Sequence, residues 1–581
     1  MLILGINAYH GDVAAVLLHD GALVAAIEEE RFRRVKHWAG FPEQAIQECL
    51  RIAGASPADI DRVAVSRNPR AHLWRKAMFA VRNRPDPRLL ADRARNAFNV
   101  TRLYTRLSES LALPVDHVRR RIDFVEHHPA HLASSFFASP FEEAAVCAID
   151  GFGDFVSTSS ASGAGSRLRV SDRVFFPHSL GLLYLAITQF LGFSRYGDEF
   201  KVMGLAPYGE PIFADRIRQL VHVDEDGEVR LNLPYFSHWS QGVAMTWDDG
   251  EPSIGPVFTP LLETLLGPAR QRDDALDARH EAMAASLQLV HEECVFRVLR
   301  ALHRRTRQSR LCLAGGCAMN SVANGKVRAQ TPFSEVYIQP ASGDNGTALG
   351  AALHSWHAQG GRREFVMTHG YWGPEFDNDE IARDIHGVDT AGRVARQRID
   401  DEETLCQWTA ERIADGKVVG WFQGRMEWGA RALGNRSIVA DPRRADMRDI
   451  INTRIKFREK FRPFAPSIAV EALDEYFVDA VPDPFMIQVY PVRPDKREVI
   501  PAVTHVDGSG RLQTVSRESN PRYWCLIEAF RALTGVPVLL NTSFNENEPI
   551  VHRPAEALDC FLRTNMDVLV MGNHVLEKLS N

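Results

Sequence analysis

The sequence contains no apolar run of the ~18–20 residues that a bilayer-spanning helix needs. Its most apolar stretch, residues 180–193, is interrupted by Tyr184, Thr188 and Gln189. The first residues, MLILGINAYHGD, lack the basic start and the cleavage site of a signal peptide. The eight cysteines are scattered and form no CxxC pair, which argues against a zinc ribbon or a disulfide framework. We therefore expect a soluble cytoplasmic protein with no membrane partner.

The charge is nearly balanced, with 68 Lys and Arg against 74 Asp and Glu among 581 residues. A net charge of −6 gives no general attraction to nucleic acid. Segment 67–121 differs, because its fourteen Lys and Arg outnumber its four Asp and Glu and leave it at +10. We interpret it as a solvated, basic helical insertion. An electropositive wall for an anionic substrate is the alternative, with RNA binding a weaker one.

Short apolar strands open the chain at residues 2–6, 13–19 and 22–28. Asp20-Gly21 joins the second and third, and this pair favours a two-residue hairpin. The βββ unit with a glycine-containing loop at 5–12 resembles the phosphate-loop hairpin of actin-like ATPase domains. A similar unit recurs at 144–149, 156–160 and 168–170. The sequence therefore predicts an internally duplicated α/β fold.

A charged stretch, Arg362-Arg363-Glu364, follows a helix that Gly360-Gly361 ends, and we place a domain boundary there. From about residue 400 the pattern becomes α/β again, with a helix to 413 and a strand at 418–422. The predicted domains are 1–361 and 362–581.

The segment EHHPAH places His127 and His131 four residues apart, so on a helix they share one face. An isolated HxxxH is more often a pair of core or surface imidazoles. Asp150 at the end of a buried strand and Asp344 in a glycine-rich turn strengthen the metal interpretation. Two imidazoles and two carboxylates suit a divalent, iron-like ion better than structural zinc.

Glycine turns form a second candidate site. Gly151 and Gly153 in DGFGD lie at a strand end, where backbone N–H groups can approach phosphates. Gly315 and Gly316, with Asn320 after them, can let a nucleoside approach the backbone. Each signal is weak alone, because glycine turns are common.

The third candidate site is basic and lies after residue 424. Arginine forks and lysine point charges both suit phosphate. The loops SNPR and NTSFN that follow are polar. A surface salt-bridge network is the alternative to a shaped anion pocket. The residues considered are Arg425, Arg431, Arg436, Lys456, Arg462, Arg522, Asn541 and Ser543.

The ordered motifs EEERFRRVKH, EHHPAH, DGFGD, KVMGLAPYG, GGCAMNSVANGK, GRMEWGARALGNRSI, KFREKFRPFAPS, SNPR and NTSFNENEPI resemble the carbamoyltransferase family of NodU and the cephalosporin hydroxymethyl carbamoyltransferase. The resemblance implies an actin-like, threonylcarbamoyl-transferase-like first domain and a YrdC-like second domain. It implies that the second domain forms carbamoyl-adenylate from carbamoyl phosphate and Mg-bound ATP. The first domain then transfers the carbamoyl group to the hydroxyl of a natural product or sugar, with an Fe(II)-type metal.

The resemblance also implies roles for individual residues. His127, His131, Asp150 and Asp344 would bind the metal. Lys456, Arg462, Arg522, Asn541 and Ser543 would form the carbamoyl-adenylate site, with Lys456 and Arg462 acting on the reacting group. Gly151, Gly153, Gly315, Gly316 and Asn320 would hold nucleotide in the first domain.

The first loop departs from the family, because Gly11 stands where relatives have a histidine. Asp12 is kept, so we expect Asp12 with His10 to orient and deprotonate the acceptor. Two other functions stay open: threonylcarbamoylation of tRNA and a non-catalytic actin-like nucleotide sensor. The acceptor and the oligomeric state are not defined by the sequence, and a homodimer is one option.

Overall fold

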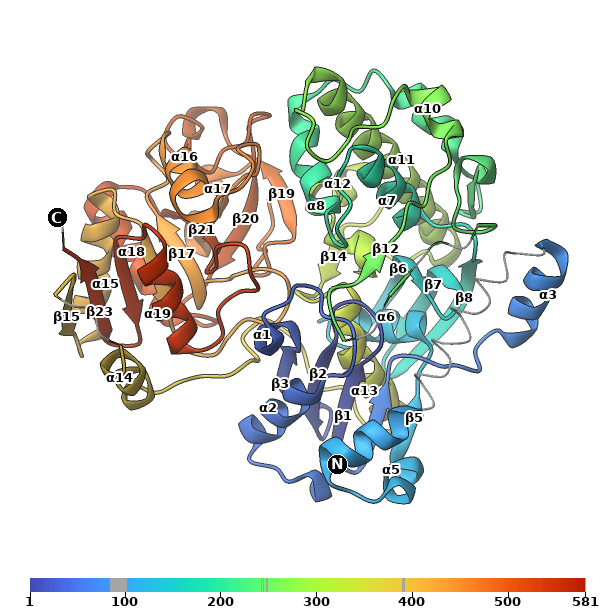
Figure 1. Cartoon of the computed structure of the whole chain (residues 1–581), viewed down its shortest axis with the longest axis horizontal. Helices are drawn as coiled ribbons and strands as arrows, with labels where there is room; N and C mark the ends of the chain where they lie inside the picture. The colour runs from blue at the N-terminus through green and yellow to red at the C-terminus, as the bar shows by residue number, and fades with distance from the viewer. Residues whose placement is uncertain (84–101, 242, 244, 247–248, 389–391, 580–581) are drawn as a thin grey trace. The chain divides into compact units, whose positions relative to one another are not determined.

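The computed structural model describes residues 1–83, 102–241, 243, 245–246, 249–388 and 392–579 (Figure 1). The chain divides into two compact units, Met1–Met367 and Thr368–Asn581. The first unit extends past the charged stretch at 362–364, because Arg363 donates to the carbonyl groups of Phe141 and Ser139. Among the described residues, no helix is long and apolar enough to cross a membrane.

The first sheet of unit 1 is built from the predicted opening strands. Its order is β3-β2-β1-β4-β5, in which β1, β2 and β3 are antiparallel and β4 and β5 run parallel to β1. Asp20 and Gly21 both have positive φ, 49° and 84°, so the predicted Asp-Gly hairpin is confirmed. The strands are β1 (Leu2–Asn7), β2 (Ala14–His19), β3 (Ala22–Glu28), β4 (Arg62–Val65) and β5 (Ile122–Phe124).

The second sheet repeats this topology. Its order is β8-β7-β6-β13-β14, with the first three strands antiparallel and the last two parallel to β6. The matching strand order confirms the predicted duplication. Asp150 to Gly153 belong to β6 instead of a loop beyond it, because an irregular register between Ile149 and Gly153 lets the strand continue. The strands are β6 (Glu143–Gly153), β7 (Val156–Ala164), β8 (Arg167–Phe175), β13 (Arg310–Ala314) and β14 (Glu335–Ile338).

Two helices lie between these sheets and pack against each other: α6 (His127–Phe136) against the second sheet and α13 (Thr347–Ala358) against the first (Figure 1). Gly350 makes their close approach possible, because a Cβ there would lie 1.7 Å from the carbonyl oxygen of Ala130. Further helices of unit 1 are α1 (Glu30–Arg33), α2 (Glu43–Ala53), α7 (Leu180–Phe190), α8 (Glu199–Leu205), α9 (Ala214–Ile217), α10 (Leu261–Leu266), α11 (Ala278–Thr306) and α12 (Ser321–Gln330).

The basic segment 67–121 is mostly helical where it is described, with turns at 69–72 and 112. It contains α3 (Leu73–Asn83), a helical stretch at 102–111 and α5 (Val115–Arg121). Its part from 84 to 101 lies outside the described residues.

Unit 2 is built on one mixed nine-stranded sheet of order β15-β23-β22-β16-β17-β21-β18-β20-β19. Its large apolar core includes the fully buried Trp421. The strands are β15 (Val394–Arg398), β16 (Val419–Phe422), β17 (Arg436–Ala440), β18 (Ala465–Ala469), β19 (Gln488–Pro491), β20 (Ser509–Val515), β21 (Val538–Ser543), β22 (Val568–Met571) and β23 (His574–Lys578). The helices are α14 (Asn378–His386), α15 (Glu402–Ala414), α16 (Met447–Ile451), α17 (Leu473–Tyr476), α18 (Pro521–Thr534) and α19 (Pro554–Arg563).

Candidate functional site

The first turns of α6 place His127 and His131 side by side, as the four-residue spacing predicts. Their Nε2 atoms lie 3.0 Å apart, and both side chains are buried. The carboxylate of Asp154 accepts a hydrogen bond of 3.0 Å from the His127 N–H, which satisfies a free donor at the helix start. Gly153 leaves room for this arrangement, since a Cβ there would lie 1.9 Å from the His127 ring.

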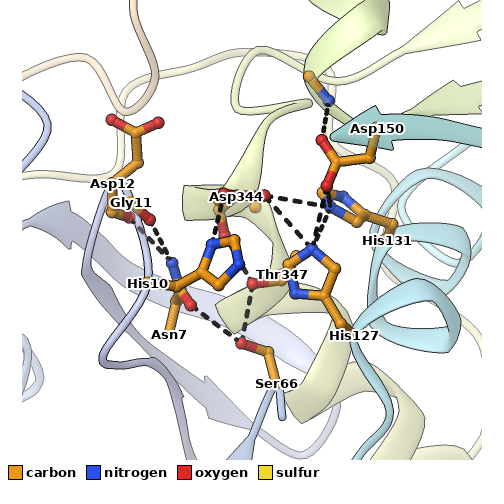
Figure 2. Close-up of polar contacts among 12 residues, drawn as sticks. Asn7, His10, Gly11, Asp12, Ser66, His127, His131, Asp150, Asp344 and Thr347 are labelled. Atoms are coloured by element: carbon orange, nitrogen blue, oxygen red, sulfur yellow. Dashed lines mark hydrogen bonds and ion pairs between the residues drawn. The ribbon is translucent and has the colours of Figure 1, made fainter. Parts of the chain in front are cut away.

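Two carboxylates face the histidine pair (Figure 2). The Nε2 atom of His127 lies 3.4 Å from an oxygen of Asp150 and 3.4 Å from Oδ1 of Asp344. The Nε2 atom of His131 also lies 3.4 Å from that Asp344 oxygen. One ligand atom from each of the four buried residues lies within 4.8 Å of the others. The four residues predicted as metal ligands thus come together in space.

The atoms in this cluster fit a bound cation. Oδ1 of Asp344 is buried and accepts no hydrogen bond from any residue that the structure describes. Burial alone would lower the pKa of His127, yet Asp150 and Asp344 raise that pKa to about 10, so the carboxylates favour positive charge here. Buried imidazole and carboxylate ligands suit a divalent first-row metal.

The neighbouring glycines shape this cluster. The Gly316 N–H donates to Oδ1 of Asp150 over 2.8 Å and so orients the carboxylate. Gly315 has a φ of 90°, and a Cβ there would lie 2.2 Å from the carbonyl oxygen of Ile149. Asn320 caps α12 by accepting from the Ala323 N–H. A Cβ on Gly151 would meet nothing within 4 Å, so among these glycines Gly151 leaves open space.

In the first loop, His10 and Asp12 have different partners. Nδ1 of His10 lies 2.6 Å from Oδ2 of Asp344, whereas Oδ1 of Asp12 lies 2.7 Å from Nδ1 of His37. Figure 2 shows the Asp12 carboxylate pointing away from His10. Asn7 holds the loop by donating to the carbonyl oxygens of Gly11 and Asp12. His37 is not among the predicted site residues, although it is the last residue of the motif EEERFRRVKH.

In unit 2, the positive charges of Arg431, Arg458 and Arg462 act on Arg511, and we name these four residues the anion pocket. Burial lowers the pKa of Arg431 to about 10 and that of Arg458 to about 9. Burial, with the positive charges of the other three, holds the pKa of Arg511 well below its usual range. Nε of Arg431 and of Arg511 are buried without a hydrogen-bond acceptor among the described residues. Such a cluster is arranged to receive a multiply charged anion.

Two of these arginines were predicted as binding residues, Arg431 and Arg462, and Arg458 lies in the motif KFREKFRPFAPS together with Arg462. Arg511 was missed, because it lies on β20, far from that run in sequence. The signal available was one arginine in an otherwise uncharged strand, SGRLQTV.

Other predicted arginines are engaged elsewhere in unit 2. Arg436 is fully buried and donates to the carbonyl oxygens of Gln423, Gly424 and Pro374. Arg425 donates to main-chain carbonyls at 372 and 373. Arg522 contacts Glu402 and Gln423. The structure therefore does not bring these three guanidinium groups into the anion pocket.

Lys456 is buried against the segment that carries Ser543. Its Nζ donates to the Ser543 hydroxyl over 3.3 Å and to the main-chain oxygen of Asn545 over 2.8 Å. Asn541 lies within β21, so the prediction that it is loop-borne is wrong. Its amide group donates to Ser467 on the adjacent strand β18 and to Gln513 on β20, the strand beyond β18. Lys456 and Ser543 thus form one cluster, which Asn545 completes.

A two-unit α/β chain that has a buried imidazole-carboxylate cluster in one unit and a group of buried arginines in the other is a candidate group-transfer enzyme. The family descriptions Carbamoyltransferase N-terminus and Carbamoyltransferase C-terminus match residues 2–353 and 410–578. The chain belongs to the carbamoyltransferase family, and it is a carbamoyltransferase.

Relatives of known sequence support this membership along the chain. The chain is 42% identical to protein sll1178 of Synechocystis, over 99% of this chain and 96% of that protein. It is 42% identical to nodulation protein NolNO of Sinorhizobium fredii, over 98% of this chain and 80% of that protein. It is 39% identical to the 3'-hydroxymethylcephem-O-carbamoyltransferase of Amycolatopsis lactamdurans, over 45% of this chain and 48% of that enzyme.

Proposed function

We propose that the protein is an ATP-dependent O-carbamoyltransferase that works in two steps. In the first, carbamoyl phosphate, water and ATP give carbamoyl-adenylate, phosphate and pyrophosphate in unit 2. In the second, unit 1 transfers the carbamoyl group to an acceptor hydroxyl and AMP is released. The observation that carries the proposal is the contrast between an anion pocket in unit 2 and a cation-favouring cluster in unit 1.

Unit 2 supplies the charges that the first step needs. The anion pocket would hold the phosphates of Mg-bound ATP, because guanidinium groups donate two parallel hydrogen bonds to phosphate oxygens. Lys456 would contribute a point charge beside Ser543. We assign the YrdC-like role to this unit on these contacts and on the motifs KFREKFRPFAPS and NTSFN.

Unit 1 supplies the transfer site. His127, His131, Asp150 and Asp344 would hold an Fe(II)-type ion. The chemistry that such an ion supplies when bound is Lewis-acid polarisation of a carbonyl oxygen. The Asp12 carboxylate would accept the acceptor's hydroxyl proton, while the acceptor oxygen bonds to the carbamoyl carbon and the bond to AMP breaks. The duplicated sheets support an actin-like fold for this unit.

The acceptor that we propose is the hydroxyl of a small molecule, either a natural product or a sugar. The hydroxymethylcephem enzyme among the relatives supports this class. ATP and carbamoyl phosphate are metabolites of the cytoplasm, where we place the reaction.

The test is incubation with ATP, carbamoyl phosphate and a panel of hydroxyl compounds that includes 3'-hydroxymethylcephem, aminoglycosides and simple sugars. We expect one acceptor class to gain the mass of one CONH group, and we expect the gain to need ATP. Transfer that proceeds equally without ATP would contradict the adenylate step. Salt-sensitive binding of tRNA with modification of its adenosine would favour the tRNA alternative.

A further inference from the structure

Asp12 and His37 form a hydrogen-bonded pair at the edge of the first loop. The loop brings Asp12 out of β1, and His37 follows α1, so the two meet across 25 residues of sequence. Both residues are in the left-handed backbone region, with φ values of 53° and 54°. Residues other than glycine seldom adopt this conformation, and where they do the strain is concentrated at functional sites.

Contacts on several sides fix the imidazole of His37. Its main-chain N–H donates to Oε2 of Glu30 over 2.7 Å. The ring of Tyr196 packs edge-on against it, with centroids 5.3 Å apart. The residue after Tyr196 is Gly197, where a Cβ would lie 2.4 Å from Nε2 of His37. The surrounding chain is therefore shaped around this side chain.

Tyr196 also explains the glycine at position 11. A Cβ on Gly11 would lie 2.4 Å from the Tyr196 hydroxyl, so the phenol occupies the space that a larger residue would need. Burial, together with the carboxylates of Asp344, Asp12 and Asp150, holds the pKa of Tyr196 well above its usual range. Tyr196 therefore interacts electrostatically with carboxylates of both the Asp12–His37 pair and the imidazole-carboxylate cluster.

The contacts that the structure describes for the His10 ring are with groups other than Asp12. One ring nitrogen of His10 contacts Asp344, and the other lies 3.3 Å from the carbonyl oxygen of Phe152. The side-chain contact that the structure describes for the Asp12 carboxylate is with Nδ1 of His37.

We propose that His37 is the positioning residue of the acceptor site: its protonated imidazole binds one oxygen of Asp12 and directs the other oxygen to the acceptor hydroxyl. This inference rests on the proposed function. In the transfer step the hydroxyl proton moves to Asp12, the acceptor oxygen bonds to the carbamoyl carbon, and AMP leaves with the electron pair of the broken bond. His37 keeps its proton throughout. Tyr196 limits the space beside Gly11.

The charge state of His37 fits this role. Burial lowers its pKa, but Asp12 and Glu30 outweigh burial and the opposing charge of Lys36 and raise the pKa to about 9. Glu199, the first residue of α8, also interacts electrostatically with His37. The groups that face His37 are thus Asp12, Glu30, Lys36, Tyr196 and Glu199. The cation is present at neutral pH and is lost as the pH rises through about 9.

The test compares His37→Asn with the wild-type protein. An asparagine amide can replace Nδ1 as a donor and tolerates the left-handed backbone, but it carries no charge. The probes are 3'-hydroxymethylcephem and glycerol, and pyrophosphate exchange reports the first step separately. We expect transfer to fall about tenfold or more because a neutral donor holds the Asp12 carboxylate less tightly than a cation does, and we expect exchange to be unchanged. The control is His19→Asn, an exposed histidine that lies outside the site.

The pH profile separates positioning by charge from a merely structural role. Wild-type transfer should decline above about pH 9, and the decline should be absent in His37→Asn. Wild-type rates with an unchanged profile in this variant would overturn the inference. So would a second metal per chain that the variant loses, since Asp12, Glu30 and His37 would then be ligands.

Failure of the proposed function would look different. In that case the wild-type protein carbamoylates neither probe, whether or not carbamoyl-adenylate forms, and the effect of His37→Asn on transfer cannot be measured. The pair is then tested by NMR titration of the His37 ring. A midpoint near 9 that falls in Asp12→Asn supports the charged pair, and a midpoint that the substitution leaves unchanged overturns it.

Discussion

Nδ1 of His10 lies 2.6 Å from Oδ2 of Asp344, across 334 residues of sequence. The contact leaves Oδ1 of Asp344 facing the Nε2 atoms of His127 and His131, each at 3.4 Å. His10 therefore decides which oxygen of the carboxylate is presented to the cluster. Such an outer contact orients a ligand and tunes its basicity.

Removing either histidine of the cluster should remove the metal. We expect His131→Ala to abolish acceptor transfer and to leave pyrophosphate exchange nearly intact, because the cluster belongs to unit 1 and we propose that exchange takes place in unit 2. Elemental analysis of anaerobically purified protein should find iron in the wild type and little in the variant. The matched control is His128→Gln, on the same helix, whose ring contacts the Val156 carbonyl oxygen instead. Full metal content in His131→Ala, or full activity with stoichiometric zinc, would count against the assignment.

Arg511 should contribute to ATP binding although it is far in sequence from the other arginines. Truncating a buried charged contact costs ~2–5 kcal/mol, so Arg511→Leu should raise the KM for ATP in pyrophosphate exchange by roughly 30-fold or more. Arg462→Lys should also be impaired, since a point charge does not reproduce a planar fork. Arg444→Leu is the control, because Arg444 pairs with Asp446 on the surface. Unchanged KM values for ATP in both pocket variants would show that the pocket binds something else.

Close packing of α6 and α13 should be required for the cluster. In Gly350→Ala the new Cβ meets the Ala130 carbonyl oxygen, so α6 must shift along with His127 and His131. Overpacking of this kind costs ~1–3 kcal/mol, and metal affinity should fall together with the melting temperature. Gly387→Ala meets nothing closer than 3.5 Å and serves as the control. Unaltered metal content and stability in Gly350→Ala would contradict the packing account.

Asp483 should make unit 2 less stable as the pH rises. Burial raises its pKa to about 7, although main-chain N–H groups at Phe485 and Ile487 oppose the shift. The folded chain therefore holds this proton more tightly than the unfolded chain, whose carboxyl titrates near pH ~4. The resulting stabilisation is complete below that pH and is lost as the pH rises to about 7. In urea unfolding, the free energy of unfolding of the wild type should fall between about pH 4 and pH 7, and that of Asp483→Asn should not show this fall. The same dependence on pH in both proteins would contradict the prediction.

Local patterns in the sequence predicted the elements well. The Asp20-Gly21 pair predicted its hairpin because the required backbone angles belong to those two residues. The spacing of His127 and His131 predicted a shared helix face for the same reason. Asp150 and Asp344 could be added because the sequence predicts one after a buried apolar run and the other in a glycine-rich turn.

Partners distant in sequence could not be predicted. Arg436 and Arg511 have the same chemistry, yet one is folded onto main-chain carbonyls and the other lies in the anion pocket. That difference depends on which strands are neighbours, which local sequence does not encode. The pairing of Asp12 with His37 instead of His10 also depends on how α1 meets the first loop.

Rapid-quench analysis of a single turnover tests the central claim, that the two units carry out separate steps. His127→Ala is mixed with ATP and carbamoyl phosphate in the presence of an accepted hydroxyl compound, and quenched samples are analysed by mass spectrometry. We predict that carbamoyl-adenylate and pyrophosphate form at the wild-type rate, that carbamoyl-adenylate accumulates, and that no carbamoylated acceptor appears. A variant that forms neither pyrophosphate nor adenylate while remaining folded, or one that still carbamoylates the acceptor, would contradict this account.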